Sequence, residues 1–131
     1  MSAIDQYFSA NQTALNLRNT RLELIAQNIA NATTPNYRAR DLDFSAAMRS
    51  ASAGINMRTT NNGHMELSAV SVAAQGDAIV YRVPLNPSLD SNTVEIGIEQ
   101  AKFGRAAADY QASLQFLENR IGGLRKALRG D

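Results

Sequence analysis

The side chains that could perform chemistry are few, and they are widely spaced along the chain. His64 is the only histidine, it follows a polar Asn-Asn-Gly turn, and the sequence has no cysteine to complete a metal shell or form a disulfide. Asp41 and Asp43 are close carboxylates, but acid–base catalysis needs such a pair in a cleft, and nothing in the sequence indicates one. We therefore interpret His64 as a solvated loop residue.

Other catalytic and binding motifs are missing as well. Serine and threonine are plentiful but have no base with an orienting partner, and no glycine pattern for phosphate or dinucleotide binding occurs. The net charge of +1 creates no general attraction for nucleic acid. We expect no catalytic residue, cofactor, metal, nucleic-acid partner or small-molecule substrate. A cell-wall enzyme stays an alternative only if a carboxylate pair lies in a cleft.

The composition is that of one modest domain. The chain has 131 residues and no segment resembling a cleaved secretory signal or a membrane span, so these facts alone predict a soluble cytoplasmic protein. Positive charges gather near the C-terminus, where they complement a helix dipole, and contact with an anion is the alternative. These cations are Arg120, Arg125, Lys126 and Arg129.

Both ends of the chain show the 4-3 spacing of a helix that packs along a narrow stripe. The N-terminal seam comprises Ile4, Phe8, Asn11, Leu15, Arg18, Leu22, Ile25 and Ile29. The C-terminal seam comprises Ile96, Phe103, Ala107, Tyr110, Leu114, Leu117, Ile121, Leu124 and Leu128. We predict helices over about 2–31 and about 92–128, the second with Asn92 as N-cap, Glu95 three residues later and Gly130 past its end.

Helices of this length do not fit a compact globule. At 1.5 Å per residue a helix over 92–128 spans roughly 54 Å, whereas a compact chain of this size has a radius of gyration of about 14 Å. The helices either pair and leave much seam exposed or pack with helices of other chains, and seams at both termini favour the second. The predicted fold class is mainly α: long N- and C-terminal helices, 1–31 and 92–131, pairing as a coiled coil around a small irregular or β-containing middle.

The middle of the chain differs in composition from both ends. Residues 45–91 are mostly small or polar, and their apolar runs are short. We predict an irregular or partly disordered insert, with one short strand near 78–83, where the sequence AIVYRV is rich in β-formers.

Between the first helix and this insert, residues 32–44 form a specific turn. Pro35 ends the helix, and Thr34 to Tyr37 fits a type II turn that places Asn36 where φ is positive. After the turn, four residues form an exposed ladder of charges of alternating sign between Tyr37 and Phe44: Arg38, Arg40, Asp41 and Asp43. The predicted turn and interface residues are Asn28, Asn31, Pro35, Asn36, Tyr37, Arg38, Arg40, Asp41, Asp43 and Phe44.

Three ordered motifs give the chain a family resemblance. "ANATTPNY" (30–37) resembles the "ANxxTPGY" signature of the flagellar rod, hook and hook-associated axial proteins. "YRARDLDF" (37–44) and "YRVPLNPSLDSNTVEI" (81–96) are similar to segments of the proximal rod subunits in that family. The resemblance covers both ends of the chain and is weak only in 45–78.

Two positions depart from the family pattern, which usually has glycine where Asn36 and Ser91 stand. Asparagine tolerates positive φ next best after glycine, so we expect the turn to survive. We expect Ser91 to add N-capping capacity beside Asn92.

The resemblance implies a structural subunit of the proximal rod, which is part of the flagellar drive shaft in the periplasm. It implies export by the flagellar type III apparatus without a cleaved signal, which reverses the cytoplasmic expectation. The implied partners are copies of this chain in a helical assembly, other rod proteins, the hook-basal-body adaptor protein, and the MS ring or export gate. Asn11 and Arg18 are the polar seam positions that could fix the packing register. The alternative is a helical chaperone or adaptor of a type III secretion system.

Overall fold

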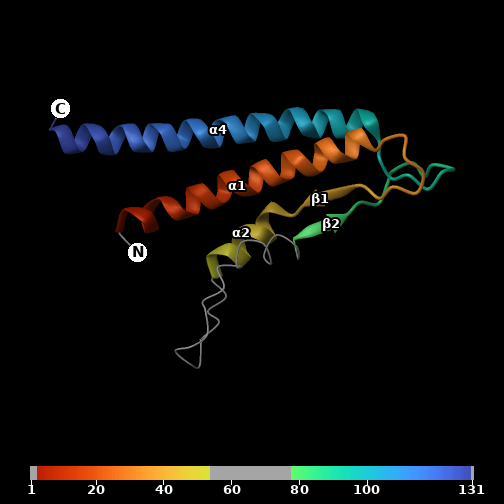
Figure 1. Ribbon diagram of the computed structural model, residues 1–131, viewed down its shortest axis with the longest axis horizontal. Coiled ribbons are helices and arrows are strands. Elements are labelled where there is room, and N and C mark those ends of the chain that lie inside the picture. Colours follow the sequence, from red (N-terminus) through yellow and green to blue (C-terminus); the bar gives the residue numbers. More distant parts are fainter. Residues whose placement is uncertain (1–2, 54–77, 131) are drawn as a thin grey trace, which may run out of the picture.

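The computed structural model describes residues 3–53 and 78–130, with side chains over 8–51 and 78–130. His64 and the side chain of Ile4 therefore lie outside the described residues. The elements, in chain order, are α1 (Ala3–Ala30), β1 (Arg40–Leu42), α2 (Phe44–Ala53), β2 (Ile79–Tyr81) and α4 (Ile96–Arg129). The predicted fold class, mainly α with long terminal helices and a strand-containing middle, is confirmed (Figure 1).

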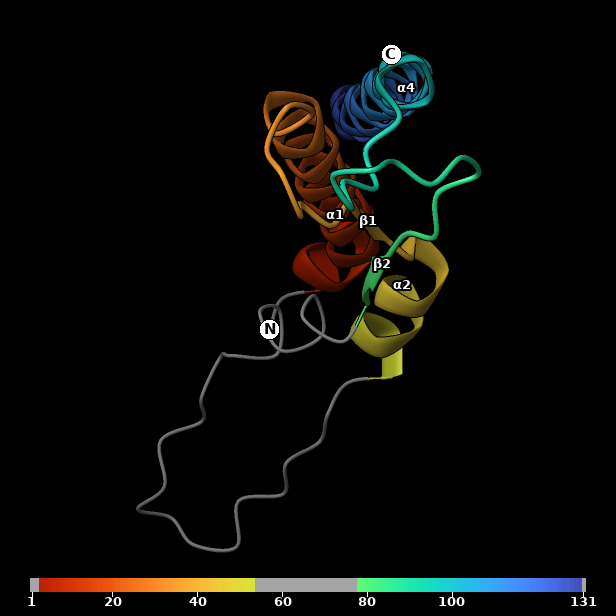
Figure 2. The same ribbon diagram turned by 90° about the vertical axis from the view of Figure 1, so that its right-hand side faces the viewer.

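The two long helices lie side by side and run in opposite directions (Figure 1). The end of α1 meets the beginning of α4, and from there the helices draw apart towards the chain termini. Figure 2 shows the same pair nearly end-on. Because α1 moves away from α4, it leaves the second half of α4 without close cover from α1.

The short elements form an arm that packs on α1, defined as β1, α2 and β2. The two strands pair antiparallel, and Asp41 lies opposite Val80. The arm contacts a different side of α1 from the one that meets α4 (Figures 1 and 2). Its apolar core is small, with Phe44, Met48 and Ile79 packed around it, and it consists of Leu17, Leu24, Leu42, Ala47 and Ala78.

Helix α2 lies where an irregular insert was predicted, so that prediction is wrong over 45–53. Asp43 starts the helix, because its Oδ1 accepts a hydrogen bond from the backbone N–H of Ala46 at 3.0 Å. Ala47 is buried against α1, which holds this short segment helical through tertiary packing. Strand β2 lies inside the predicted range 78–83.

The long C-terminal helix begins later than predicted. It starts at Ile96, its N-cap is Glu95, and that cap has no side-chain hydrogen bond. The prediction of Asn92 as N-cap is therefore wrong, because the Asn92 side chain is used elsewhere. The C-terminal cap is confirmed: Gly130 has a φ of 76°, and its N–H donates to the carbonyl oxygen of Lys126.

Over residues 3–53 and 78–130, two residues other than glycine adopt the left-handed backbone conformation, and both stand where the resemblance to axial proteins implies glycine. Asn36 has a φ of 60°, and the N–H of Tyr37 donates to the carbonyl of Thr34 at 3.3 Å, as the predicted turn requires. Ser91 has a φ of 59°. The expectation that Ser91 caps the helix is wrong, since it lies in a tight turn before the helix begins.

We expect Ser91→Gly to stabilise the protein by about 1 kcal/mol, because a Cβ in the left-handed region costs roughly that much. The free energy of unfolding can be measured by urea denaturation followed by circular dichroism. Ser45→Gly, an exposed serine inside α2, is the matched control and should destabilise slightly. Equal effects of the two substitutions would contradict the conformational argument.

Candidate assembly interface

The side of α4 that meets α1 is polar and narrow. Glu99 and Ala106 are the buried residues of α4, and Lys102 and Asp109 beside them are half-buried. These four positions repeat with a 3-4-3 spacing, so they form one stripe along the helix. Ala106 allows α1 to approach closely, and Glu99 reaches polar groups of α1 and the arm. The contact between the two long helices is therefore set by small and polar residues.

The C-terminal seam lies beside this stripe and remains largely uncovered. Its exposed members range from Leu114, 37% exposed, to Leu128, 86% exposed, with Ile121 at 49%. Tyr110 and Leu117 are half-buried. This seam is therefore not the main contact with α1, and its part in assembly stays a prediction. Within the described residues it is the longest exposed apolar row on a helix.

Helix α1 has two contact sides. Ile25 is fully buried, and four N-terminal seam residues are half-buried: Phe8, Leu15, Leu22 and Ile29. Leu17 and Leu24 are buried against the arm and do not belong to the predicted seam. Sequence reasoning missed this second side, although leucines seven residues apart on a helix were the available signal.

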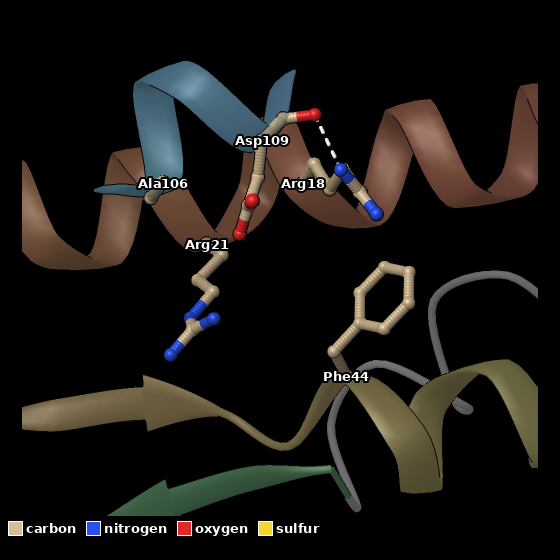
Figure 3. Close-up of a pocket in the computed structure, with 5 residues that line it drawn as sticks. All are labelled: Arg18, Arg21, Phe44, Ala106 and Asp109. Atoms are coloured by element: carbon tan, nitrogen blue, oxygen red, sulfur yellow. Dashed lines mark hydrogen bonds between the residues drawn. The ribbon is translucent and has the colours of Figure 1, made fainter. Parts of the chain in front are cut away.

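Arg18 links the two helices and the arm at mid-length. A guanidinium N–H donates to the backbone carbonyl of Asp109 on α4, and the guanidinium lies 5.3 Å from the centre of the Phe44 ring. These side chains border a cavity of about 90 Å³, which Arg21 and Ala106 also line (Figure 3). Arg18 therefore contacts α4 at a defined position, which is what the predicted register role requires.

A partly buried charge cluster, consisting of Arg21, Asp41, Arg82 and Glu99, joins α1, the arm and α4. Asp41 accepts hydrogen bonds from Arg21 Nε at 2.9 Å and from Arg82 Nη2 at 2.6 Å. Arg82 also donates to Glu99 Oε1. Glu99 is only 1% exposed, and a buried carboxylate is costly unless it is paired, so the ion pair with Arg82 offsets the cost of burying it.

The contacts of the cluster shift its titration. Burial raises the pKa of Asp41, but the hydrogen bonds from Arg21 and Arg82 outweigh burial and hold that pKa below its ordinary value. The hydrogen bond to Asp41 raises the pKa of Arg21. Burial, followed by the nearby charge of Arg82, lowers the pKa of Lys102.

These contacts correct the predicted exposed ladder of charges. The Asp41 side chain is 13% exposed and paired on both sides, so it belongs to the interior. Arg40 donates to Gln27 Oε1 of α1 at 2.9 Å, and Asp43 is occupied in capping α2. Of the four charged residues in the predicted ladder, only Arg38 and Asp43 are exposed. Sequence alternation alone could not reveal that α1 and α4 cover one side of the strand.

Asn28 closes the outer edge of β1. Its Nδ2 donates to the carbonyl of Arg40 at 2.7 Å, and its Oδ1 accepts from the N–H of Arg40 at 3.0 Å, as a neighbouring strand would. The second Nδ2 hydrogen donates to Glu99 Oε2 at 3.0 Å. The side chain is fully buried, and both its amide nitrogen and its amide oxygen form hydrogen bonds. Asn28 therefore connects α1, β1 and α4.

Asn92 connects the turn that follows α1 with the turn that precedes α4. Its Nδ2 lies within 3.0 Å of three carbonyl oxygens at the end of α1, those of Asn31, Ala32 and Thr34. Its Oδ1 accepts from the N–H of Val94. These carbonyls belong to the turn that follows α1, so Asn92 ties that turn to the segment that precedes α4. The turn motif and the 81–96 motif thus meet around one buried side chain.

No protein-family model matches the sequence. The chain is, however, 44% identical over 131 residues to the flagellar basal body rod protein FlgB of Cereibacter sphaeroides, and the match covers 100% of both chains. The chain belongs to the FlgB family. It is also 37% identical to FlgB of Salmonella typhimurium, over 99% of this chain and 98% of that one. FlgB of Escherichia coli is 35% identical, with 98% of this chain and 97% of that one covered.

Membership of the FlgB family makes this chain a structural component of the flagellar basal-body rod. The resemblance to axial proteins is confirmed, and these relatives give no support to the alternative of a secretion chaperone. In residues 3–53 and 78–130, no group of three acidic, histidine or cysteine side chains is placed to bind a metal. No helix in that part of the chain is both long and apolar enough to cross a membrane.

The sequence of this FlgB-family chain partly indicated its buried polar residues, Asn28, Asn92 and Glu99. Asn28 was predicted as part of a turn and interface strip, but its role is internal. Glu99 falls in the gap of the C-terminal seam between Ile96 and Phe103, and this interruption was the signal for a special position. Nothing local indicated Arg82 as its partner, because that pairing depends on how the arm folds back.

We expect the free energy of unfolding to fall on acidification from about pH 5 to about pH 2. The folded-state pKa of Asp41 lies below its unfolded value, so its contribution is complete above that unfolded value, about 3.9, and is lost as pH falls through the folded pKa. Urea denaturation across this range measures the slope. Asp41→Asn should flatten it, and equal slopes for variant and parent would refute the assignment.

Proposed function

We propose that this FlgB-family chain is a proximal rod subunit that enters the shaft through its two terminal helices. The supporting observation is the exposed C-terminal seam, which continues from Leu114 to Leu128 where α1 has drawn away (Figure 1). A large apolar side chain contributes about 1.5–3 kcal/mol when it is fully buried. Because this row is exposed in the single chain, much of this free energy is gained only when a neighbouring subunit covers it.

The geometry favours open-ended assembly. The uncovered seam lies at one end of an elongated molecule, and the turns around Asn36 and Ser91 lie at the other (Figure 1). Different surfaces at opposite ends suit heterologous contacts, which extend into helical structures and do not close on one pair. The seam residues of both helices are the proposed contact set, including Ile4 and Phe8.

The turn segment has a smaller proposed role than its sequence predicted. Leu42 is buried and Phe44 is packed against α1 within the same chain. The exposed residues Pro35, Asn36 and Arg38 form the part that we propose contacts a neighbour. Asn11 and Arg18 are proposed to fix the register between helices, with Arg18 bonded to α4.

The proposed neighbours are copies of the chain, other rod proteins, the hook-basal-body adaptor protein, and the MS ring or export gate. The proposed location is the periplasmic rod, reached through the flagellar type III apparatus without a cleaved signal. No catalytic step is part of this role. The support is family membership together with the uncovered helical seam.

Fractionation tests the proposal. The chain would be expressed with a small epitope tag in a flagellated strain that lacks its own FlgB. We expect the chain in purified hook–basal bodies and restored swimming in soft agar. Recovery of the chain only in the cytosolic fraction would refute the rod assignment and support an adaptor. A tagged flagellar chaperone, followed in the same preparation, is the control for cytosolic carry-over.

A further inference from the structure

Two neighbouring sides of α4 are able to face α1. The polar stripe that does so includes Lys102, Ala106 and Asp109, and the last two are seen beside α1 in Figure 3. Each of the three is followed directly by a residue of the apolar seam, namely Phe103, Ala107 and Tyr110. Successive residues lie about 100° apart around a helix, so a rotation of α4 by about that angle would turn the seam towards α1.

Hydrophobicity alone favours the seam as the contact side. Phe103 is 40% exposed and Ile96 is 48% exposed, although the burial of such side chains is favourable. Helix α1 offers apolar surface of its own, because Leu22 and Ile29 are only half-buried. An interaction of the polar stripe must therefore outweigh the apolar contact that the chain leaves unmade.

Glu99 supplies this interaction. Its carboxylate accepts a hydrogen bond from Asn28 Nδ2 of α1 at 3.0 Å and forms the ion pair with Arg82. Asn28 is fully buried, and Glu99 is almost fully buried. A rotation that carried Glu99 away from α1 would leave buried polar groups with fewer partners, which is costly.

The other links between the two ends of the chain are less selective for one side of α4. Arg18 donates to the backbone carbonyl of Asp109, and every residue of a helix carries such an oxygen. Asn92 lies before the helix begins and bonds to the turn after α1, so it ties down the start of α4. The bond between Asn28 and Glu99 joins two side chains, and it therefore specifies which side of α4 faces α1.

We propose that Glu99 is a positioning residue that holds the polar side of α4 against α1 and so keeps the chain from burying its own apolar seam. Buried polar contacts of this kind select one helix pairing over another at some cost in stability. The inference rests on the proposed function, because it explains how the single chain keeps available the seam that we propose for assembly. It applies whichever neighbour covers the seam.

Two cysteine reporters at adjacent positions can detect the rotation, because the chain has no cysteine of its own. Ala106→Cys lies on the buried stripe, and Ala107→Cys lies on the half-buried seam. The rate of reaction with a thiol reagent, measured on the full-length chain, reports how accessible each position is. A loosened helix exposes both reporters, whereas a rotated helix changes them in opposite directions.

Glu99→Ala removes the carboxylate without adding apolar bulk to the stripe, and Arg82 keeps its ion pair with Asp41. In this variant we expect about tenfold faster reaction at Ala106→Cys, together with slower reaction at Ala107→Cys, because the seam turns inward. Incorporation of Glu99→Ala into basal bodies should fall for the same reason.

Two further variants serve as controls. Glu99→Gln keeps a side-chain oxygen that can accept from Asn28 and Arg82, so both reporters should react as in the parent chain. Glu118→Ala makes the same substitution at an exposed glutamate of the same helix and should change neither rate.

Several results would overturn the inference. Faster reaction at both reporters, or unchanged rates, in Glu99→Ala would exclude the rotation. Loss of helix content in that variant, measured by circular dichroism, would also overturn it, because such a chain has no second pairing to avoid. A Glu99→Gln variant that reacts like Glu99→Ala would remove the role of the hydrogen bonds. The reporters use the isolated chain, so they can fail while co-purification with basal bodies still supports the rod assignment.

Discussion

Ile121→Asp is expected to abolish incorporation of the chain into the rod while the isolated chain stays folded. Ile121 is 49% exposed in the single chain, so the aspartate can remain hydrated there, and the free energy of unfolding should change by less than about 1 kcal/mol. In an assembled rod the same position would be covered. A carboxylate without a partner in an apolar contact costs several kcal/mol, which is enough to prevent a contact of this kind from forming.

The measurements are swimming in soft agar and the amount of chain in purified basal bodies, in a strain without the native subunit. Asn119→Asp is the control, because it places the same charge two residues away on an exposed part of α4 outside the seam. The control should swim. Normal swimming of the Ile121→Asp strain would remove the C-terminal seam from the assembly contacts.

Arg82→Met is expected to lower the free energy of unfolding by about 3–5 kcal/mol, the usual cost of leaving a buried charge without its partner. Arg82 supplies one hydrogen bond to Asp41 and one to Glu99, which is almost fully buried. After the substitution Asp41 still has Arg21, but Glu99 loses its cation. The loss should therefore come mainly from Glu99.

A second substitution tests this reasoning. Glu99→Leu on the Arg82→Met background removes the stranded charge, and Asn28 keeps its hydrogen bonds to the backbone of Arg40. The double variant should recover much of the lost stability, which urea denaturation can measure. Arg38→Met, at an exposed position, is the matched control and should change stability by about 0.5 kcal/mol or less. A similarly small effect of Arg82→Met would show that the cluster is not needed.

Local features of the sequence were enough for the long helices and the turn between them. Apolar spacing located α1 and α4 to within a few residues, and Pro35 with Asn36 located the turn. Helix α2 was missed because its run of small residues has no strong period of its own. Its helical state depends on Asp43 as a cap and on the burial of Ala47 against α1.

The charge cluster could not be predicted for a different reason. Asp41 pairs with Arg21, which is 20 residues away in the sequence, and with Arg82, which is 41 residues away. These pairings depend on how the arm folds back onto α1, which the local sequence does not indicate. Without that knowledge, alternating charges were interpreted as an exposed ladder. Periodicity likewise predicted that the C-terminal seam is apolar, but not whether its own chain or another would cover it.

The pairing of the first and last helices has a consequence for the order of folding. Strand β1 is fixed to α1 by side-chain hydrogen bonds that span 12 to 20 residues, as between Asn28 and Arg40. The hydrogen bonds that join α4 to α1 span 71 residues, between Asn28 and Glu99, and 91 residues, between Arg18 and Asp109. Closing longer loops costs more entropy and slows folding, so α4 should dock last. A chain delivered N-terminus first can therefore order β1 and α2 on α1 early, but it completes its fold only once β2 and the last helix have arrived.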